Sequence, residues 1–274
     1  MIRTSFCENF LLPCHTQKTG KNPLSEVISV HGPAGPLIIR VLISVLLYNN
    51  DEKHGGEFLI MTHKGGGGED EVGFNNRSFP HWDNLYANET SVGSLPWYNK
   101  NLDDDLEEYL HTMNITKGRF LDLGTGPATQ AIELSKLGFQ VTATDISENA
   151  ITRAKRMSKG IEFIVDDILD SKLKEDSFDY IFDRGCFHVL EPSYRQRYVN
   201  QVSRFLRERG LLFLKTFSAK ESSTAGGGPY RFSIDEIDSV FSDRFVRQSF
   251  KETVYQGTLG ILPKALLVVL RKKT

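Results

Sequence analysis

From residue 118 onward, short apolar runs alternate with segments in which apolar residues recur every three or four positions. Five buried strands are predicted from the runs GRFLDLG, FQVTATD, IEFIVDD, FDYIFDRG and LLFLKTF. Helices are predicted between them over ATQAIELSKLG, SENAITRAKRMSKG and SYRQRYVNQVSRFLRERG. Gly138 is the expected C-cap of the first helix and Ser147 the expected N-cap of the second. In the third helix, Tyr198, Val202 and Phe205 with Leu206 share one face.

A helix over SIDEIDSVFS and strands over FVRQSFKETVY and LPKALLVVLRK complete the pattern. Strands that alternate with helices are typical of a largely parallel sheet with helices on both faces. We therefore expect residues 80–274 to form one doubly wound α/β domain.

Residues 1–79 show no steady period and form an N-terminal extension to which the sequence assigns no role. PLIIRVLISVLLYNNDEKHGGEFLIMTHKGGGG is compatible with a strand, a polar turn and a second strand, and Gly65–Gly68 with a flexible linker. The apolar run LIIRVLISVLLY (37–48) is too short for a membrane span, which needs about 20 apolar residues. His31, His54 and His63 lack the spacing of metal ligands, so no metal site is predicted.

Composition excludes several classes of function. The net charge of −2 gives no overall attraction to nucleic acid or to anionic membranes. Three cysteines are too few for a disulfide framework, and the N-terminus lacks a clean apolar export signal, so we expect a reduced, cytoplasmic setting. Five arginines between residues 195 and 209 fit the solvated face of a helix better than an RNA-binding surface. Nothing in the pattern indicates an oligomeric state.

Polar residues gather where four successive predicted strands end. Asp122 precedes a glycine turn, Asp145 ends the second strand, Asp166 and Asp167 end the third, and Asp183 ends the fourth. Ligands of open α/β sheets bind at the carboxyl ends of the strands. The sequence therefore predicts a ligand site at this edge.

The glycine turn LDLGTGPATQ resembles a nucleotide-binding loop. Gly124 and Gly126 allow a sharp turn and close approach of the backbone to a ligand, and the helix that follows can bind an anion at its N-terminus. Asp145, 19 residues beyond Gly126, stands where a carboxylate accepts hydrogen bonds from ribose hydroxyls. These features suit NAD and S-adenosylmethionine (SAM) equally.

Two residues favour SAM over NAD. Position 129 is Thr where G-x-G-x-x-G has its third glycine, which allows the helix to pack under a pyrophosphate. SAM has no pyrophosphate. Asp122 would repel a pyrophosphate but attract a sulfonium cation. We therefore expect SAM as the cofactor.

With these motifs, residues 80–274 resemble the class I SAM-dependent methyltransferases. The resemblance rests on FLDLGTGPA as the first motif, TATDIS with its ribose-binding acid and VDDIL with its adenine-edge acid. It implies a seven-stranded, Rossmann-like sheet whose last strand, KALLVVLRK, inserts antiparallel. FDYIFDRGCFHVLEPSYRQRYV and HWDNLYANETSVGSLPWYN are most similar to the thiol, halide and thiopurine methyltransferases. The chain departs from that group at Tyr98, where Asp is common, and at Thr125 and Pro127.

The resemblance also implies the roles of individual residues. Trp82 and Trp97 would lie near the methionine end of SAM, and Asp183, Arg184 and Gly185 would border the methyl group and its acceptor. The implied cofactor-binding set is Trp82, Trp97, Asp122, Gly124, Thr125, Gly126, Asp145, Ile146, Asp166, Asp167, Ile168, Asp183, Arg184 and Gly185. His188 is the candidate general base, because the pKa of a free His lies near neutrality.

The sequence thus predicts an enzyme that methylates a small molecule, with sulfur as the favoured acceptor and S-adenosylhomocysteine as the by-product. Two alternatives stay open: methylation of oxygen or nitrogen on a small molecule or a protein, and a non-catalytic module that binds SAM or a nucleotide. Tyr230, Arg231 and Phe232, which follow a glycine-rich segment, either close over the substrate or form a surface turn.

Overall fold

The computed structural model describes residues 14–17, 27–32, 35–40, 81–88, 92–221 and 229–274. The chain divides into two units, residues 1–66 and residues 67–274. In the first unit, β1 (Cys14–Gln17), β2 (Val27–Gly32) and β3 (Gly35–Arg40) form an antiparallel sheet in the order β1-β2-β3. The strand expected from residue 37 is thus confirmed over 37–40. Its expected partner strand, the glycine linker, His54 and His63 lie outside the described residues, whereas His31 is in β2.

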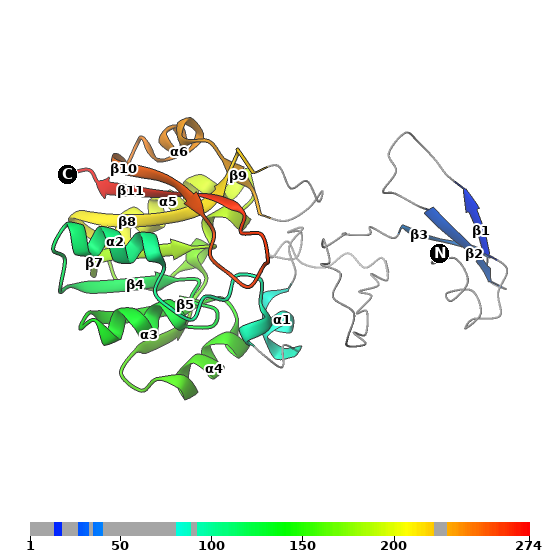
Figure 1. The fold of residues 1–274 in the computed structure, drawn as a ribbon, viewed down its shortest axis with the longest axis horizontal. Helices are drawn as coiled ribbons and strands as arrows, with labels where there is room; N and C mark the ends of the chain where they lie inside the picture. The colour runs from blue at the N-terminus through cyan, green and yellow to red at the C-terminus, as the bar shows by residue number, and fades with distance from the viewer. Residues whose placement is uncertain (1–13, 18–26, 33–34, 41–80, 89–91, 222–228) are drawn as a thin grey trace. The chain divides into compact units, whose positions relative to one another are not determined.

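The second unit is built on one large sheet (Figure 1). Its strand order is β10-β11-β8-β7-β4-β5-β6, and β9 pairs with β8 beside this path. The pairings between β6, β5, β4, β7 and β8 are parallel, whereas β11 is antiparallel to both β8 and β10. The strands are β4 (Arg119–Leu123), β5 (Gln140–Asp145), β6 (Glu162–Val165), β7 (Phe178–Arg184), β8 (Leu206–Ser218), β9 (Arg231–Phe232), β10 (Phe245–Val254) and β11 (Lys264–Lys272). The predicted doubly wound α/β fold and its antiparallel last strand are confirmed.

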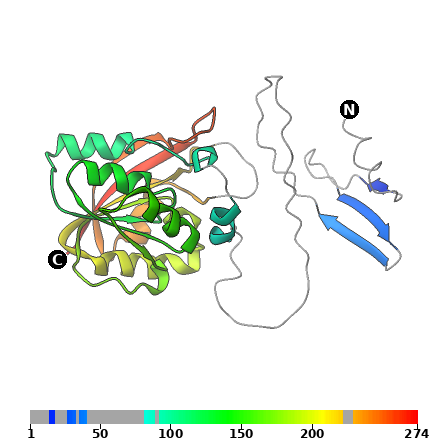
Figure 2. The same ribbon diagram turned by 90° about the horizontal axis from the view of Figure 1, so that it is seen from below.

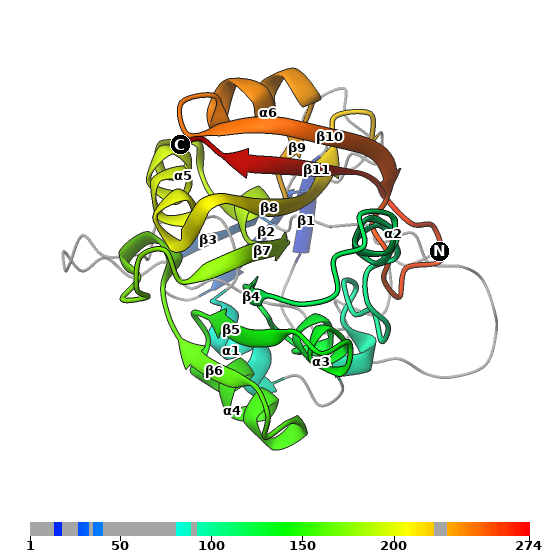
Figure 3. The same cartoon turned by 90° about the vertical axis from the view of Figure 1, so that its left-hand side faces the viewer.

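Helices cover both faces of this sheet (Figure 3). Apolar side chains of α2, α3 and α4 form one buried cluster with the sheet, and those of α5 and α6 form a second cluster on the opposite face. The helices are α1 (Trp82–Asn88), α2 (Asp104–Thr112), α3 (Thr129–Lys136), α4 (Glu148–Met157), α5 (Pro192–Phe205) and α6 (Ile234–Phe241), with short 3-10 turns η1 (Val92–Ser94), η2 (Ile168–Asp170) and η3 (Phe187–Val189).

Local signals in the sequence account for several helix ends. Gly138 follows α3 with φ 95°, a conformation that glycine adopts without steric cost. Ser147 caps α4 by accepting a hydrogen bond from the Ala150 N–H (3.0 Å), as expected. Ser233 and Glu236 form a capping box at the start of α6.

The expected helix over residues 193–210 is wrong in its last part. α5 ends at Phe205, and Leu206 already belongs to β8, where it pairs with Phe178. The carbonyl of Phe205 accepts a hydrogen bond from the Ser177 N–H (2.9 Å). Pairing with a distant strand therefore ends a segment whose own residues favour a helix. Leu206 is nevertheless fully buried, as the apolar pattern indicates.

Within the described ranges, no helix is both long and apolar enough to cross a bilayer. Most of the 37–48 apolar run lies outside these ranges.

Candidate functional site

The carboxyl ends of β4, β5, β6 and β7 form one edge of the sheet, and the predicted acids are at this edge. Backbone hydrogen bonds join neighbouring loops there, from Thr125 N–H to the Thr144 carbonyl (2.8 Å) and from Asp166 N–H to the Asp145 carbonyl (3.0 Å). Asp122, Asp145 and Asp183 are all buried. The structure therefore brings together the strand-end residues that the sequence singled out.

The turn after β4 contains three residues in the left-handed region: Gly124 (φ 71°), Gly126 (φ 46°) and Ala128 (φ 61°). The residue with the third positive φ is therefore Ala128, and Thr129 is already the first residue of α3. Ala128 provides no side-chain cap for α3, and the Ala131 N–H in the first turn bonds the Asp122 carboxylate. Such a helix start accommodates the carboxylate of a ligand.

Carboxylates hold this turn in place. Asp122 Oδ2 accepts a hydrogen bond from the Thr125 hydroxyl (2.5 Å). Asp145 accepts one from the Gly126 N–H (2.8 Å) through Oδ2 and one from the Ser147 N–H (2.9 Å) through Oδ1. Each carboxylate oxygen has a second lone pair, so Asp145 keeps acceptor capacity for ligand hydroxyls.

Burial changes the protonation of these acids. It raises the pKa of Asp122 to about 6, with the neighbouring charges of Asp145 and Asp183 adding to the effect. Burial also raises the pKa of Asp145. A cationic ligand would stabilise the ionised form of Asp122, whereas a pyrophosphate would oppose it.

Helix α1 packs against the glycine turn at the same end of the unit (Figure 2). A Cβ on Gly126, whose φ is 46°, would clash with the Tyr86 hydroxyl, so a larger residue there would displace Tyr86. Trp97 forms a side-chain hydrogen bond with Tyr86. The ring of Trp97 meets that of Trp82 edge to face, with 6.0 Å between centroids. Both tryptophans therefore lie beside the predicted methionine end.

Asp83 fastens α1 to the start of α4. Its carboxylate accepts hydrogen bonds from the Ser147 hydroxyl (2.8 Å), the Asn149 N–H (2.9 Å) and the Asn149 side-chain amide (2.9 Å). These bonds are made beside Asp145 and link α1 directly to the loop that holds that acid.

The loops after β5 and β6 present an apolar side chain beside an acid. Ile146, next to Asp145, is 42% exposed although it is apolar, so it offers a surface for a flat ring. Asp167 caps η2 through the Leu169 N–H (2.9 Å), and Ile168 is buried. Asp166 Oδ1 accepts from the Lys172 N–H (3.1 Å), whereas its buried Oδ2 has no partner among the described residues.

Asp183 holds the turn after β7. Its carboxylate accepts hydrogen bonds from the N–H groups of Gly185 (3.0 Å), Cys186 (2.8 Å) and Phe187 (2.9 Å) and from the Tyr198 hydroxyl (2.6 Å). Burial raises its pKa to about 6, against the opposing effect of these donors. Asp183 thus shapes the loop, and its four donors occupy its acceptor capacity.

Gly185, His188 and Tyr255 converge beyond that turn. A Cβ on Gly185 (φ 129°) would lie 3.0 Å from the Tyr255 hydroxyl and 3.5 Å from His188 Nε2. The His188 ring lies against Phe217 and Tyr255, with centroid distances of 5.0 and 5.6 Å. Burial, and then the charge of Arg184, lower the pKa of His188 to about 3, so its imidazole is neutral. Its Nδ1 is buried and has no partner within the described part of the chain.

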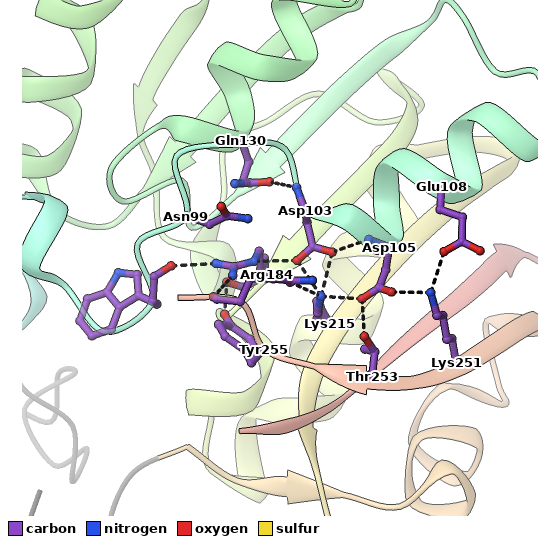
Figure 4. A network of polar contacts seen from close by, with 12 residues as sticks. Asn99, Asp103, Asp105, Glu108, Gln130, Arg184, Lys215, Lys251, Thr253 and Tyr255 are labelled. Carbon is purple, nitrogen blue, oxygen red and sulfur yellow. Dashed lines mark hydrogen bonds and ion pairs between the residues drawn. The ribbon is translucent and has the colours of Figure 1, made fainter. Parts of the chain in front are cut away.

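Arg184 lies at the end of β7 but is turned inward, and its side chain is only 7% exposed. It donates hydrogen bonds to Asp103 and to the backbone carbonyls of Trp97 and Gln256, and its guanidinium stacks on the Tyr255 ring (Figure 4). Arg184 therefore contacts the Trp97 and Gln256 segments from the interior of the unit.

Known proteins resemble this chain in sequence and in structure. The family model for a methyltransferase domain matches residues 120–210. An uncharacterized methyltransferase of Schizosaccharomyces pombe is 35% identical over 109 residues, which make up 38% of this chain and 74% of the relative. A probable thiol methyltransferase 2 of Arabidopsis thaliana is 27% identical over 155 residues, 54% of this chain and 67% of the relative.

A solved structure shares the fold. The N-methyltransferase NodS of Bradyrhizobium japonicum, in complex with S-adenosylhomocysteine, superimposes with a TM-score of 0.55 and 16% identity over 71% of this chain and 100% of that chain.

The chain is a class I SAM-dependent methyltransferase. Its cofactor is S-adenosylmethionine, as the sequence predicts. The geometry of this methyltransferase fits that group, because each carboxylate oxygen of Asp145 keeps a lone pair and the buried Asp166 Oδ2 has no partner among the described residues.

Several residues around the candidate site are absent from the sequence-based set. Tyr86, Phe217 and Tyr255 are aromatic residues in or near predicted elements, where core packing is the usual explanation. Lys215 interrupts the apolar run LLFLKTF, and Asp103 begins the acidic run DDDLEE. A charged residue inside an apolar strand signals a buried ion pair, and these two residues form one.

Proposed function

We propose that this methyltransferase transfers the methyl group of SAM to the sulfur of a small-molecule thiol. SAM supplies a methyl group already activated on a sulfonium, so the protein has to align the acceptor and exclude water. Asp122 with Gly124, Thr125 and Gly126 would hold the methionine end, beside Trp82 and Trp97. Asp145 would bind the ribose hydroxyls, while Ile146, Ile168 and the acids Asp166 and Asp167 would contact the adenine.

The charge state of the acceptor end supports a thiol. By the acceptor end we mean the surroundings of Gly185. They contain the aromatic rings of Phe217 and Tyr255 and the neutral imidazole of His188. Asp183 is fully buried and has four donors on its carboxylate, so it keeps no free lone pair to accept a hydrogen bond from an ammonium group. This favours a neutral or soft acceptor over a protonated amine.

The weak basicity of His188 also favours a thiol as the acceptor. With a pKa of about 3, His188 can orient an acceptor by a hydrogen bond but removes a proton poorly. A thiol, whose pKa is about 8.5, forms its thiolate in water at a useful level without a strong base. An alcohol does not. The likeness to a probable thiol methyltransferase supports the same choice.

The proposal is tested by incubating the protein with SAM and panels of thiols, amines and alcohols, and by measuring S-adenosylhomocysteine and methylated product by mass spectrometry. We expect turnover with thiols, and loss of both turnover and S-adenosylhomocysteine binding in Asp145→Ala. Asp170→Ala removes an exposed acid from the η2 segment and is the matched control that should keep both. Turnover with amines or alcohols alone would refute the thiol assignment. Cofactor binding without turnover on every panel would favour a non-catalytic module.

A further inference from the structure

The acceptor end is walled by two segments that are far apart in sequence. One contains Pro96 and Trp97, and the other contains Tyr255, Gln256 and Gly257. A Cβ on Gly257 would run into the Pro96 carbonyl, so the two backbones touch. Thr258 adds two hydrogen bonds, from its N–H to the Pro96 carbonyl (3.1 Å) and from its hydroxyl to the Leu95 carbonyl (3.0 Å).

A single side chain ties both segments to the end of β7. Arg184 Nη1 donates to the Trp97 carbonyl (2.9 Å), Nη2 donates to the Gln256 carbonyl, and Nε donates to Asp103 Oδ2 (2.9 Å). Its guanidinium carbon lies 4.4 Å from the centroid of the Tyr255 ring. The Tyr255 hydroxyl in turn donates to the Arg184 carbonyl (2.6 Å). The fork of Arg184 thus fixes both walls at once.

Asp103 is itself held by a buried lysine. Lys215 Nζ donates to both oxygens of Asp103 (2.8 and 2.7 Å), to Asp105 Oδ2 (2.7 Å) and to the Gln256 side-chain carbonyl (2.6 Å). The side chains of Lys215 and Asp103 are wholly buried. Two cations therefore face two carboxylates in the interior, and Figure 4 shows this network continuing to Lys251 and Glu108.

A buried ionic network of this kind contributes little to the free energy of unfolding. The cost of removing the charges from water offsets much of their attraction, and apolar side chains of similar volume stabilise a fold as well. Apolar side chains, however, do not fix the orientation of neighbouring groups as hydrogen bonds do. The hydrogen bonds of Arg184 fix two carbonyls and one ring that stand around Gly185 and His188.

We propose that Arg184, supported by Asp103 and Lys215, is a positioning residue that holds the Trp97 and Tyr255–Gln256 segments together at the acceptor end. The assignment deepens the proposed function and rests on it for the identity of the acceptor. Arg184 acts through Trp97 and Tyr255 and does not touch the acceptor. Its loss should therefore misplace the acceptor while leaving the adenosine-binding acids unchanged.

The test is Arg184→Lys, which keeps the charge but not the three-way fork. Arg247→Lys is the matched control, because Arg247 forms a comparable two-pronged pair with Asp238 on the surface. We expect Arg184→Lys to lower kcat/KM for the thiol by about 10- to 100-fold, the range that a misplacement of about 1 Å produces. Its affinity for adenosine, which lacks the methionine end beside Trp97, should stay within about 3-fold of the wild type, a free-energy change below about 0.7 kcal/mol. Arg247→Lys should change neither.

Amide hydrogen exchange gives a readout that does not depend on turnover. The Thr258 N–H, bonded across the two segments, should exchange at least about 10-fold faster in Arg184→Lys and at the wild-type rate in Arg247→Lys. Unchanged exchange at Thr258 would overturn the proposal. So would a parallel loss of adenosine affinity, which would indicate a general structural role. If the wild type methylates no thiol, the proposed function fails, and exchange at Thr258 still decides whether Arg184 joins the segments.

Discussion

Tyr198→Phe removes one hydrogen bond from the interior and little else. The Tyr198 side chain is fully buried in α5, and its hydroxyl donates to Asp183 Oδ2 at 2.6 Å. Phe fills the same ring volume, so no cavity of ring size forms. The three N–H groups that also bond Asp183 stay in place. The substitution therefore isolates one donor to a buried carboxylate.

The size of the effect depends on the charge of Asp183. A hydrogen bond to a charged group contributes about 1.5–3 kcal/mol and a neutral one about 0.5–1.5 kcal/mol. Burial raises the folded-state pKa of Asp183 to about 6, above the value of about 3.9 in an unfolded chain. The protein consequently gains stability from this group as the pH falls through the folded pKa, and that gain is absent above it.

The Tyr198 hydroxyl stabilises the ionised form, so removing it raises the pKa of Asp183 further. We expect Tyr198→Phe to lower the free energy of unfolding by about 2–3 kcal/mol at about pH 8 and by about 1 kcal/mol at about pH 5. Above the pKa, the Tm should fall by about 4–12 °C.

Urea unfolding at both pH values, followed by circular dichroism, measures the effect. Tyr109→Phe is the control, since Tyr109 is a half-buried ring against Phe213 whose hydroxyl has no hydrogen bond within the described residues. It should change stability by less than about 0.5 kcal/mol. A loss in Tyr198→Phe that grows toward acid pH would refute the assignment of Asp183 as an ionised acceptor at neutral pH.

Three further substitutions address the cofactor end. In the wild type, SAM affinity should fall as the pH drops from about 7.5 to 5, because Asp122, with its pKa of about 6, loses its negative charge. Asp122→Asn should bind SAM more weakly at neutral pH and show little pH dependence, which calorimetric titration over that range would reveal. Gly126→Ala places a methyl group against the Tyr86 hydroxyl at φ 46°. SAM affinity should therefore fall at least about 10-fold, a loss of about 1.4 kcal/mol in binding free energy. Wild-type affinity in this variant would contradict the geometry of the turn. Asp83→Ala removes three hydrogen bonds to the start of α4 and should cost about 1–2 kcal/mol in thermal unfolding, and an unchanged Tm would show that α1 docks without this carboxylate.

Much of the fold could be predicted because its signals are local. Short apolar runs with Asp122, Asp145 and Asp183 at or next to their last residue identify parallel strands and the edge where we expect the cofactor. The end of α5 could not be predicted. The change from helix to strand at Leu206 depends on pairing with Phe178, and the arginines that follow favour a helix. Helix α2 was not predicted, although Asp103 caps it and further acids occupy its first turn.

The surroundings of Gly185 and His188, which we propose as the acceptor end, were predictable only in part. The sequence indicated both residues and Arg184 as well, but it did not indicate that the Arg184 side chain points inward to Asp103. An apolar neighbourhood in the sequence shows that Lys215 is buried, but it does not identify a partner 112 residues away. Likewise, the low pKa of His188 arises from packing that no local pattern encodes.

The placement of β11 has a consequence for how the chain assembles. β11 follows every other strand of the large sheet in sequence, yet it lies between β8 and β10. During synthesis, β10 therefore leaves the ribosome before the only strand with which it pairs in the described sheet, and one edge of β8 stays open along residues 211–217 until β11 follows. Unpaired strand edges attract other chains. Until residues 264–272 are available, β8 and β10 therefore expose strand edges on which another chain could pair.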